Sequence, residues 1–260
     1  PLLPRYISTV DSGNLAGNLV TLRQGLLALA DKKIFTLTIF DGIADATRVL
    51  IEKTNTPELL QQFLKEVNSL SEDNEENITE IKHHLDLMEI SFKNILLEMD
   101  FDPDTENEEW ANSILKQITF TKNEINTLVP WLLLPPTPEK FIEIIPNLPA
   151  IPTIKQLAKI EQHLSHQILI AYAPDNTDPE NEWLNQFGAC ITAAGLKGKQ
   201  MMLLLKQLAL KCVELASIDY DFLYDRQQHL LTIGYNVDEN RRDNSYYDLL
   251  ASEARLTTFI

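Results

Sequence analysis

Residues 8–29, STVDSGNLAGNLVTLRQGLLAL, give the clearest indication of the fold class. Asp11 and Ser12 stand before the first leucine and are residue types that cap helices. The leucines then recur every three or four residues, which is the spacing of one face of an α-helix. They are Leu15, Leu19, Leu22, Leu26 and Leu29. This stretch predicts a capped amphipathic helix near the start of the chain.

The segment after this helix allows two interpretations. From Ile34 to Phe40, apolar and polar residues alternate, which is typical of a β-strand. Helical spacing resumes between Ala44 and Ile51, so the same residues could simply connect two helices.

The central region, residues 51–217, is predicted to be a helical accessory region. Helix starts are indicated at Thr56-Pro57-Glu58 and Thr137-Pro138-Glu139, each with Thr as cap and Pro in the first turn. The string EWAN (109–112) is echoed by EWLN (182–185), so two weak repeats are suggested, residues 55–120 and 137–191. A long helix is expected from about residue 192 to 217, and residues 55–217 should be almost entirely helical.

The pattern changes after residue 217. Residues 222–235 read as a β-hairpin of aromatic and aliphatic residues around a polar turn. A polar loop, 236–244, is expected to follow. SYYD (245–248) has the spacing of a capping box, with Asp in place of Glu, and predicts a terminal helix.

The charge of the chain excludes some partners. The net charge is −16, and residues 66–109 hold 15 acidic residues against two lysines. Nucleic acid and anionic membrane surfaces both attract basic patches, so neither is expected as a partner. The acidic run is interpreted as a solvated outer helix and loop. No apolar stretch approaches the roughly 20 residues that span a bilayer, so direct membrane insertion by this segment is not expected.

No metal or cofactor site is predicted. Counted as a calcium loop from Asp100, the sixth position is Thr105 and the twelfth is Ala111, where Gly and Glu are required. His163 and His166 share a helical face, but no third ligand lies near them in sequence. The sequence also lacks a Gly-rich phosphate loop and a serine nucleophile elbow.

Polar and aromatic residues cluster near both ends of the chain, and these clusters have two interpretations. Residues 8–14 gather hydroxyl, carboxylate and amide groups, and residues 234–238 and 243–248 add aromatic rings and further carboxylates. This mixture binds sugars, because rings stack on apolar sugar faces and polar groups address the hydroxyls. The alternative is that these residues are only helix caps and turns. Glu253, beside an apolar stripe, is either a pocket residue or one half of a salt bridge.

Two groups of strings resemble the cyclic β-1,2-glucan synthases. The first is RYISTVDSGNLAG (5–17) followed by LRQGL (22–26). The second is FLYD (222–225), IGYNVD (233–238) and SYYDLLASEARL (245–256). Both are similar to the segment that leads into the glycoamylase-like region of that family, in the family's order. Residues 51–217 are similar to the family only in being helical.

The resemblance implies a very large bacterial inner-membrane enzyme. One part polymerises glucose from UDP-glucose, a glycoamylase-like part closes the chain by transglycosylation, and a phosphorylase part trims its length. This segment would lie on the cytoplasmic side, before the glycoamylase-like part, with β-1,2-glucan and the remaining domains of the polypeptide as its partners. The catalytic carboxylates are expected beyond Ile260, so no catalytic residue is assigned and the isolated fragment is expected to be inactive.

The fold that the resemblance implies is mainly α. Residues 1–50 would supply the first helices of an (α/α) toroid, 51–217 the accessory region, and 218–260 the hairpin and the truncated start of the glycoamylase-like region. The residues expected to line the glucan cleft are those in the matching strings: Asp11, Ser12, Asn14, Tyr235, Asn236, Asp238, Tyr246, Tyr247, Asp248, Glu253 and Arg255. The alternatives are a non-catalytic helical spacer or interaction module, and part of a β-1,2-glucan hydrolase.

Overall fold

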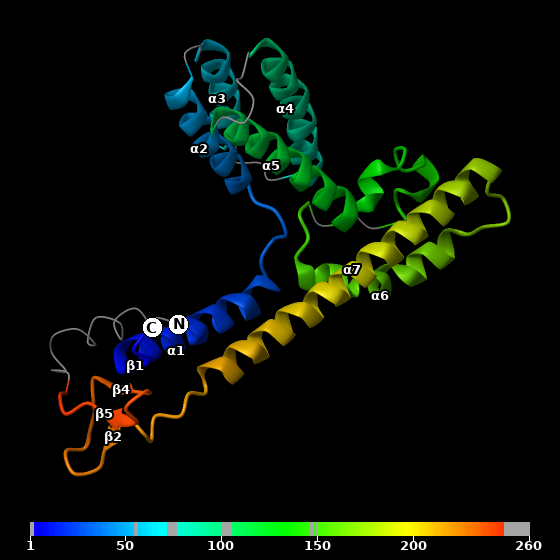
Figure 1. The fold of residues 1–260 in the computed structure, drawn as a ribbon. Helices are drawn as coiled ribbons and strands as arrows, with labels where there is room; N and C mark the ends of the chain where they lie inside the picture. Colours follow the sequence, from blue (N-terminus) through cyan, green and yellow to red (C-terminus); the bar gives the residue numbers. More distant parts are fainter. Residues whose placement is uncertain are drawn as a thin grey trace. The chain divides into compact units, whose positions relative to one another are not determined.

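The computed structural model describes residues 3–54, 57–71, 77–99, 106–145, 148 and 150–246. These residues are mainly helical, with two small antiparallel sheets (Figure 1). The α-helices are α1 (Thr9–Leu29), α2 (Thr38–Lys53), α3 (Glu58–Ser71), α4 (Ile78–Glu98), α5 (Glu106–Leu128), α6 (Ile154–Ala171) and α7 (Asp178–Ala216). Two 3₁₀ turns, η1 (Pro130–Leu133) and η2 (Glu139–Phe141), follow α5. The strands are β1 (Tyr6–Ser8), β2 (Tyr224–Asp225), β3 (Leu230–Leu231), β4 (Gly234–Asn236) and β5 (Arg241–Arg242).

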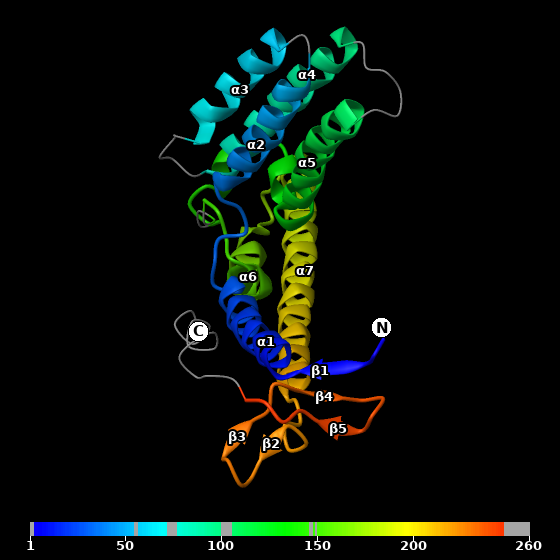
Figure 2. The same ribbon diagram turned by 60° about the vertical axis from the view of Figure 1, so that its left-hand side comes forward.

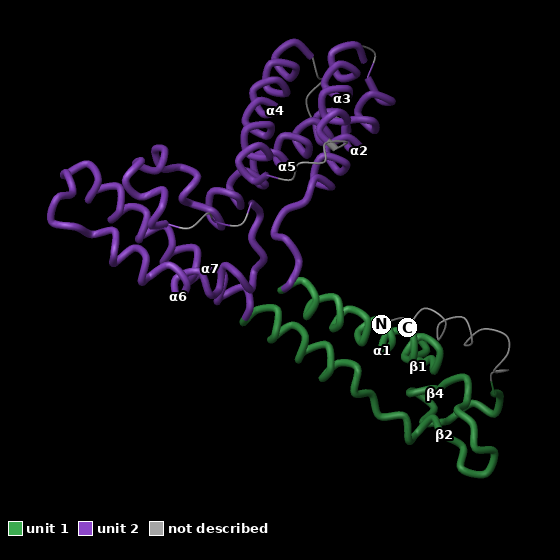
Figure 3. Tube along the Cα trace, turned by 180° about the vertical axis from the view of Figure 1, so that it is seen from behind, with its two compact units in different colours: residues 1–30, 203–260 green, residues 31–202 purple. Residues whose placement is uncertain are grey.

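The chain divides into two compact units (Figure 3). Unit 1 combines Pro1–Ala30 with Leu203–Ile260, and unit 2 is Asp31–Met202. The boundary falls within the sequence of α7. Each unit is described by itself below.

In unit 2, helices α2 to α5 lie side by side as a bundle (Figures 1 and 2). The buried residues of α4 recur every three or four positions, so that one face of the helix meets the core. They are Ile78, Ile81, Leu85, Met88, Phe92 and Ile95. Phe92 of α4 and Phe63 of α3 are both almost completely buried, and their ring centroids are 5.0 Å apart. Burial of such apolar side chains is the main force that holds the bundle together.

The other part of unit 2 pairs α6 with the first part of α7. Thr153 and Gln156 form a reciprocal capping box at the start of α6. Gly198 allows the two helices to approach closely, because a Cβ there would lie 2.5 Å from the backbone nitrogen of Ala158. At the start of α7, Trp183 stacks on Phe187 with ring centroids 5.0 Å apart, and its indole N–H donates to the Pro135 carbonyl.

Unit 1 contains both small sheets. β1 pairs with β4, and β4 pairs with β5, so the order is β1-β4-β5. β2 and β3 form a separate two-stranded hairpin. The first strand of the chain therefore lies beside strands that are more than 220 residues away in sequence (Figure 2).

Several sequence predictions are confirmed. The chain is mainly helical, and the described part of 57–216 contains no β-strand. The hairpin predicted within 222–235 is β2–β3.

The strand interpretation of residues 34–40 is wrong, because residues 34–37 connect two helices and α2 begins at Thr38. The described helices show no toroid.

Other local predictions need correction. The N-cap of α1 is Ser8, which precedes Asp11 and Ser12. The expected helix start at Thr137-Pro138-Glu139 is only the 3₁₀ turn η2, and the long helix α7 begins at Asp178 rather than near 192. The polar loop 236–244 contains β5. Tyr246, expected in the first turn of a terminal helix, instead forms a β-bridge with Thr232.

Candidate functional site

The two ends of unit 1 meet at β1 and β4. Ile7 stands opposite Tyr235 in antiparallel register. The pairing continues beyond the strands, since the Thr9 N–H donates to the Ile233 carbonyl at 3.0 Å and the Val237 N–H donates to the Arg5 carbonyl at 2.9 Å. The prediction that residues 1–32 and 219–260 lie side by side is thereby confirmed for residues 5–9 and 233–237, which bond to each other directly.

A buried threonine pair anchors this junction. The Thr9 hydroxyl donates to the backbone carbonyl of Thr232 at 2.6 Å, and both residues are buried. The Thr232 N–H donates to the Leu223 carbonyl at 3.0 Å, which links the junction to the β2–β3 hairpin. Because a buried polar group without a partner destabilises the folded state, these bonds hold the start of α1 firmly against the C-terminal strands.

Asp238 is held by Arg5. Its Oδ1 lies 2.8 Å from both Nε and one terminal nitrogen of the guanidinium, and its Oδ2 accepts the Arg5 backbone N–H at 2.8 Å. Asp238, predicted to contact glucan, therefore already has charged and backbone donors within its own unit. Arg5 was not among the residues predicted from the sequence, although it opens one of the matching strings.

The first two turns of α1 carry Asp11 and Asn14. The Ser8 hydroxyl caps the helix by accepting the Asp11 N–H at 3.2 Å, and the Ser12 hydroxyl donates to the Ser8 carbonyl at 2.7 Å. Asp11 is exposed, and its negative charge at a helix N-terminus is favourable. Asn14 is half-buried one turn further on.

Tyr235 and Asn236 are engaged with their own loop. The Tyr235 hydroxyl donates to the Asn240 side chain, and its ring meets Phe222 edge-on with centroids 5.2 Å apart. The Asn236 side-chain oxygen accepts the Glu239 N–H at 3.0 Å. These contacts agree with the interpretation of these residues as turn formers, and Tyr235 keeps part of its surface accessible.

A second polar group centres on Asp225. Its Oδ2 accepts the Tyr246 hydroxyl at 2.6 Å, and its Oδ1 accepts the backbone N–H groups of Gln227 and Gln228. The Tyr246 hydroxyl, followed by the two amides, lowers the pKa of Asp225 below its ordinary value, and the same bond raises the pKa of Tyr246. Arg242 lies 3.8 Å away and donates to the Tyr224 carbonyl at 2.6 Å. The structure therefore keeps Asp225 ionised and Tyr246 protonated.

Seven of the predicted site residues lie in the described part of unit 1, and Tyr246 among them is bonded to Asp225. They are Asp11, Ser12, Asn14, Tyr235, Asn236, Asp238 and Tyr246. The other four, Tyr247, Asp248, Glu253 and Arg255, lie outside the described residues. Sequence reasoning missed Tyr6, whose hydroxyl donates to Asp243, and it missed the role of Asp225. Tyr6 and Asp225 both stand within the matching strings, which could have indicated them.

Unit 2 has a hollow of about 640 Å³ that no sequence pattern indicated. Aromatic and aliphatic side chains line it, including Trp131, Trp183 and Phe187, and Asn77 and Thr137 contribute polar atoms. Trp183 stacks on Phe141 and on Phe187 and is only 6% exposed, so its ring offers no open surface to a sugar. The hollow therefore has the size of a ligand pocket, in which Trp183 supplies no open aromatic surface.

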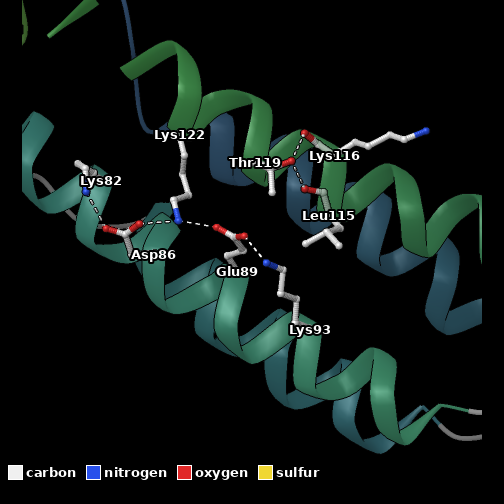
Figure 4. Close-up of polar contacts among 8 residues, drawn as sticks. All are labelled: Lys82, Asp86, Glu89, Lys93, Leu115, Lys116, Thr119 and Lys122. Atoms are coloured by element: carbon white, nitrogen blue, oxygen red, sulfur yellow. Dashed lines mark hydrogen bonds and ion pairs between the residues drawn. The ribbon is translucent and has the colours of Figure 1, made fainter. Parts of the chain in front are cut away.

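A charge cluster joins α4 to α5 in unit 2 (Figure 4). Lys122 of α5 donates to Glu89 and lies 2.6 Å from Asp86, both on α4, and Lys82 and Lys93 pair with the same two carboxylates. The acidic run predicted to be a solvated face is therefore partly used to bind two helices together. Hydrogen bonds from Lys122 and Lys93 hold the pKa of Glu89 below its ordinary value of 4.5. Burial opposes ionisation of Asp86, but the bonds from Lys122 and Lys82 leave its pKa lowered.

We expect Lys122→Met to destabilise unit 2 in a pH-dependent way. Lys122 and Glu89 are only 19% and 17% exposed, so the loss at pH 7 should be about 1–2 kcal/mol. Because the folded-state pKa of each carboxylate is lowered, their contribution is complete above about pH 4.5 and is lost as the pH falls through the folded-state values. The loss should therefore shrink as the pH falls below about 4.5. Urea unfolding followed by tryptophan fluorescence measures it, since all three tryptophans lie in unit 2.

Lys116→Met is the matched control for this measurement. Lys116 is on the same helix but is exposed and points away from the cluster (Figure 4). Its replacement should change the free energy of unfolding by no more than about 0.5 kcal/mol. A loss for Lys122→Met that does not shrink as the pH is lowered below about 4.5 would show that the pairing with Asp86 and Glu89 is not its cause.

The described residues include no cluster of His, Cys, Asp and Glu that could hold a metal ion. In the same part of the chain, no helix is both long and apolar enough to cross a membrane.

Comparison with known proteins relates this chain to part of a much longer protein. No family model matches the sequence. The chain is 27% identical over 269 aligned positions to the cyclic β-(1,2)-glucan synthase NdvB of Rhizobium meliloti (strain 1021). The alignment covers 99% of this chain but only 8% of that protein. The chain is therefore distantly related to part of a cyclic β-1,2-glucan synthase.

Proposed function

We propose that this chain is a segment of a cyclic β-1,2-glucan synthase and that its first unit contacts the glucan during cyclisation. The observation that carries the proposal is the relation to NdvB along almost the whole chain. It is supported by the pairing of β1 with β4, because this pairing joins the two ends of the chain that hold the matching strings. The segment would act on β-1,2-glucan together with the other domains of a bacterial inner-membrane enzyme.

Within unit 1, we assign the first contacts with glucan to Asp11 and Asn14. The polar groups of Ser12, Asn236 and Asp238 are engaged in bonds that hold the unit together, and Tyr246 is bonded to Asp225. Asp11, in contrast, is exposed on the first turn of α1. Carboxylate and amide groups bind sugar hydroxyls directionally, whereas an aromatic ring such as that of Tyr235 stacks on the apolar sugar face.

We expect Asp11→Ala in the complete gene product to reduce cyclisation more than polymerisation. Loss of one hydrogen-bonding partner costs about 1 kcal/mol or more, which corresponds to a roughly fivefold or greater fall in the cyclic product. Mass spectrometry of the products made from UDP-glucose separates cyclic from linear glucan. Asp41→Ala, an exposed carboxylate at the start of α2 in unit 2, is the control and should leave both products unchanged.

Two results would contradict the proposal. Equal cyclisation by the Asp11→Ala variant and the unchanged protein would favour the alternative of a helical spacer without contact to the glucan. The purified 260-residue chain is expected to produce neither cyclic nor shortened glucan from linear β-1,2-glucan. Hydrolysis by the chain alone would favour the alternative of a glucan hydrolase, which places the catalytic carboxylates within this sequence.

A further inference from the structure

Helix α1 has one fully buried residue in the described structure, and its leucines are half-buried at best. Of its 21 residues, only Thr9 is buried, although the helix contains six leucines. Its exposed apolar side chains are Leu15, Val20, Leu22, Leu27 and Leu29. A helix in water normally keeps its apolar residues on a covered face, so an uncovered helix of this composition marks an interaction surface.

The part of α7 that belongs to unit 1 has the same character. From residue 203 to 216, only Ala209 and Cys212 are buried. The exposed apolar side chains are Leu203, Leu204, Leu208, Leu210, Val213 and Leu215. The charged residues of this segment are Lys206, Lys211 and Glu214. We name the exposed apolar side chains of α1 and of residues 203–216 together the leucine surface.

The leucine surface follows more than one line along each helix, and on α1 the half-buried Leu19 and Leu26 lie between two exposed lines. At 3.6 residues per turn, Leu15 and Val20 point in directions about 140° apart, and Leu22 and Leu29 continue the line of Leu15 while Leu27 continues that of Val20. In α7, Leu203 and Leu208 are likewise about 140° apart, with Leu210 on the first line and Leu215 near the second. Each helix therefore has two uncovered apolar lines.

This geometry distinguishes between possible occupants. One flat contact with a second copy of the chain covers one side of a helix and would leave the second line of each helix in water. Helices that are apolar on several sides are found in the interior of large helical domains. The relative of this chain is long enough to supply such an interior, because the alignment covers only 8% of it.

We infer that α1 and residues 203–216 are interior helices of a larger helical domain, and that further helices of the same, longer polypeptide cover the leucine surface. This inference rests on the proposed function, under which the chain is one segment of a synthase. The covering helices must present apolar faces with few charges, because α1 itself carries only Asp11 and Arg23. Unit 1 would thus be held in the enzyme by its helices, and the end of α1 that bears Asp11 would be positioned by them.

Hydrogen exchange tests the inference without any substitution. We expect the amides of residues 15–29 and 203–215 to exchange at least about tenfold more slowly in the complete gene product than in the 260-residue chain. Equal exchange in the two proteins would overturn the inference. A complete gene product no longer than this chain would overturn it too.

The double variant L22E/L210E tests which side chains are covered. Leu22 is 52% and Leu210 is 69% exposed, so the 260-residue chain should tolerate the change, while the complete gene product should lose the slower exchange of both segments. The matched control L97E/L169E replaces two exposed leucines on α4 and α6 and should retain it. An equal effect of the control, or no effect of L22E/L210E, would contradict the inference.

Light scattering of the 260-residue chain tests the competing occupant. We expect a monomer, or aggregates without fixed stoichiometry that L22E/L210E reduces. A defined dimer that L22E/L210E dissociates would show that a second copy occupies the leucine surface, and the inference would be wrong. None of these measurements involves glucan. Their outcome is therefore independent of the Asp11→Ala test, and either the covering of the leucine surface or the contact with glucan can be disproved without the other.

Discussion

Phe92→Ala should lower the free energy of unfolding of unit 2 by about 3–5 kcal/mol. The Phe92 side chain is fully buried on α4, and its ring lies 5.0 Å from that of Phe63 on α3. Removing the ring takes away apolar burial and leaves a cavity that the surrounding helices can close only in part. The expected loss is a large share of the 5–15 kcal/mol by which typical domains are stable, so the variant should be partly unfolded at 37 °C.

The measurement is urea unfolding followed by the fluorescence of Trp110, Trp131 and Trp183, which all report on unit 2. Phe120→Ala provides the control, since Phe120 is 67% exposed on α5 and its removal should cost less than about 1 kcal/mol. A loss below about 1.5 kcal/mol for Phe92→Ala would mean that α3 and α4 are not closely packed at this contact.

Gly234→Ala should destabilise unit 1 by about 2–3 kcal/mol. A Cβ at Gly234 would lie 2.3 Å from the Tyr6 hydroxyl and 2.5 Å from the Ile7 carbonyl oxygen, both on β1. A carbonyl oxygen within a paired strand cannot move aside without loss of its neighbouring hydrogen bonds, so β1 and β4 must separate. The backbone of Gly234 is not in the left-handed region, so the glycine is required for space alone.

Hydrogen exchange of the Thr9 and Val237 amides, which bond across the junction, measures this effect. Gly25→Ala is the control within the same unit, because a Cβ there meets nothing within 4 Å and Ala improves helix propensity by up to about 1 kcal/mol. Tryptophan fluorescence should show unit 2 unchanged in both variants. Unchanged protection of Thr9 and Val237 in Gly234→Ala would show that β1 does not pair with β4 as described.

Residue type and sequence position do not show whether a polar side chain faces a ligand or bonds within the protein. Asp238 and Tyr246 are predicted to contact glucan because they stand in the matching strings, and their residue types are equally suited to bonds within the protein. Only the fold shows that Arg5 and Asp225 are their partners, at sequence separations of 233 and 21 residues. The glucan role of the remaining site residues stays a prediction, as do the boundaries of the two weak repeats.

The sequence by itself determined what depends on neighbours along the chain. The spacing of apolar residues in 8–29 predicts a helix, and the pattern of 222–235 predicts a hairpin, because both depend on local periodicity. Contacts between distant residues decided the rest. Tyr246 joins Thr232 in a bridge, β1 joins β4, and Lys122 draws the acidic run of α4 into a cross-helix cluster. No local pattern encodes these choices, since each becomes favourable only when the fold brings the second partner within hydrogen-bonding distance.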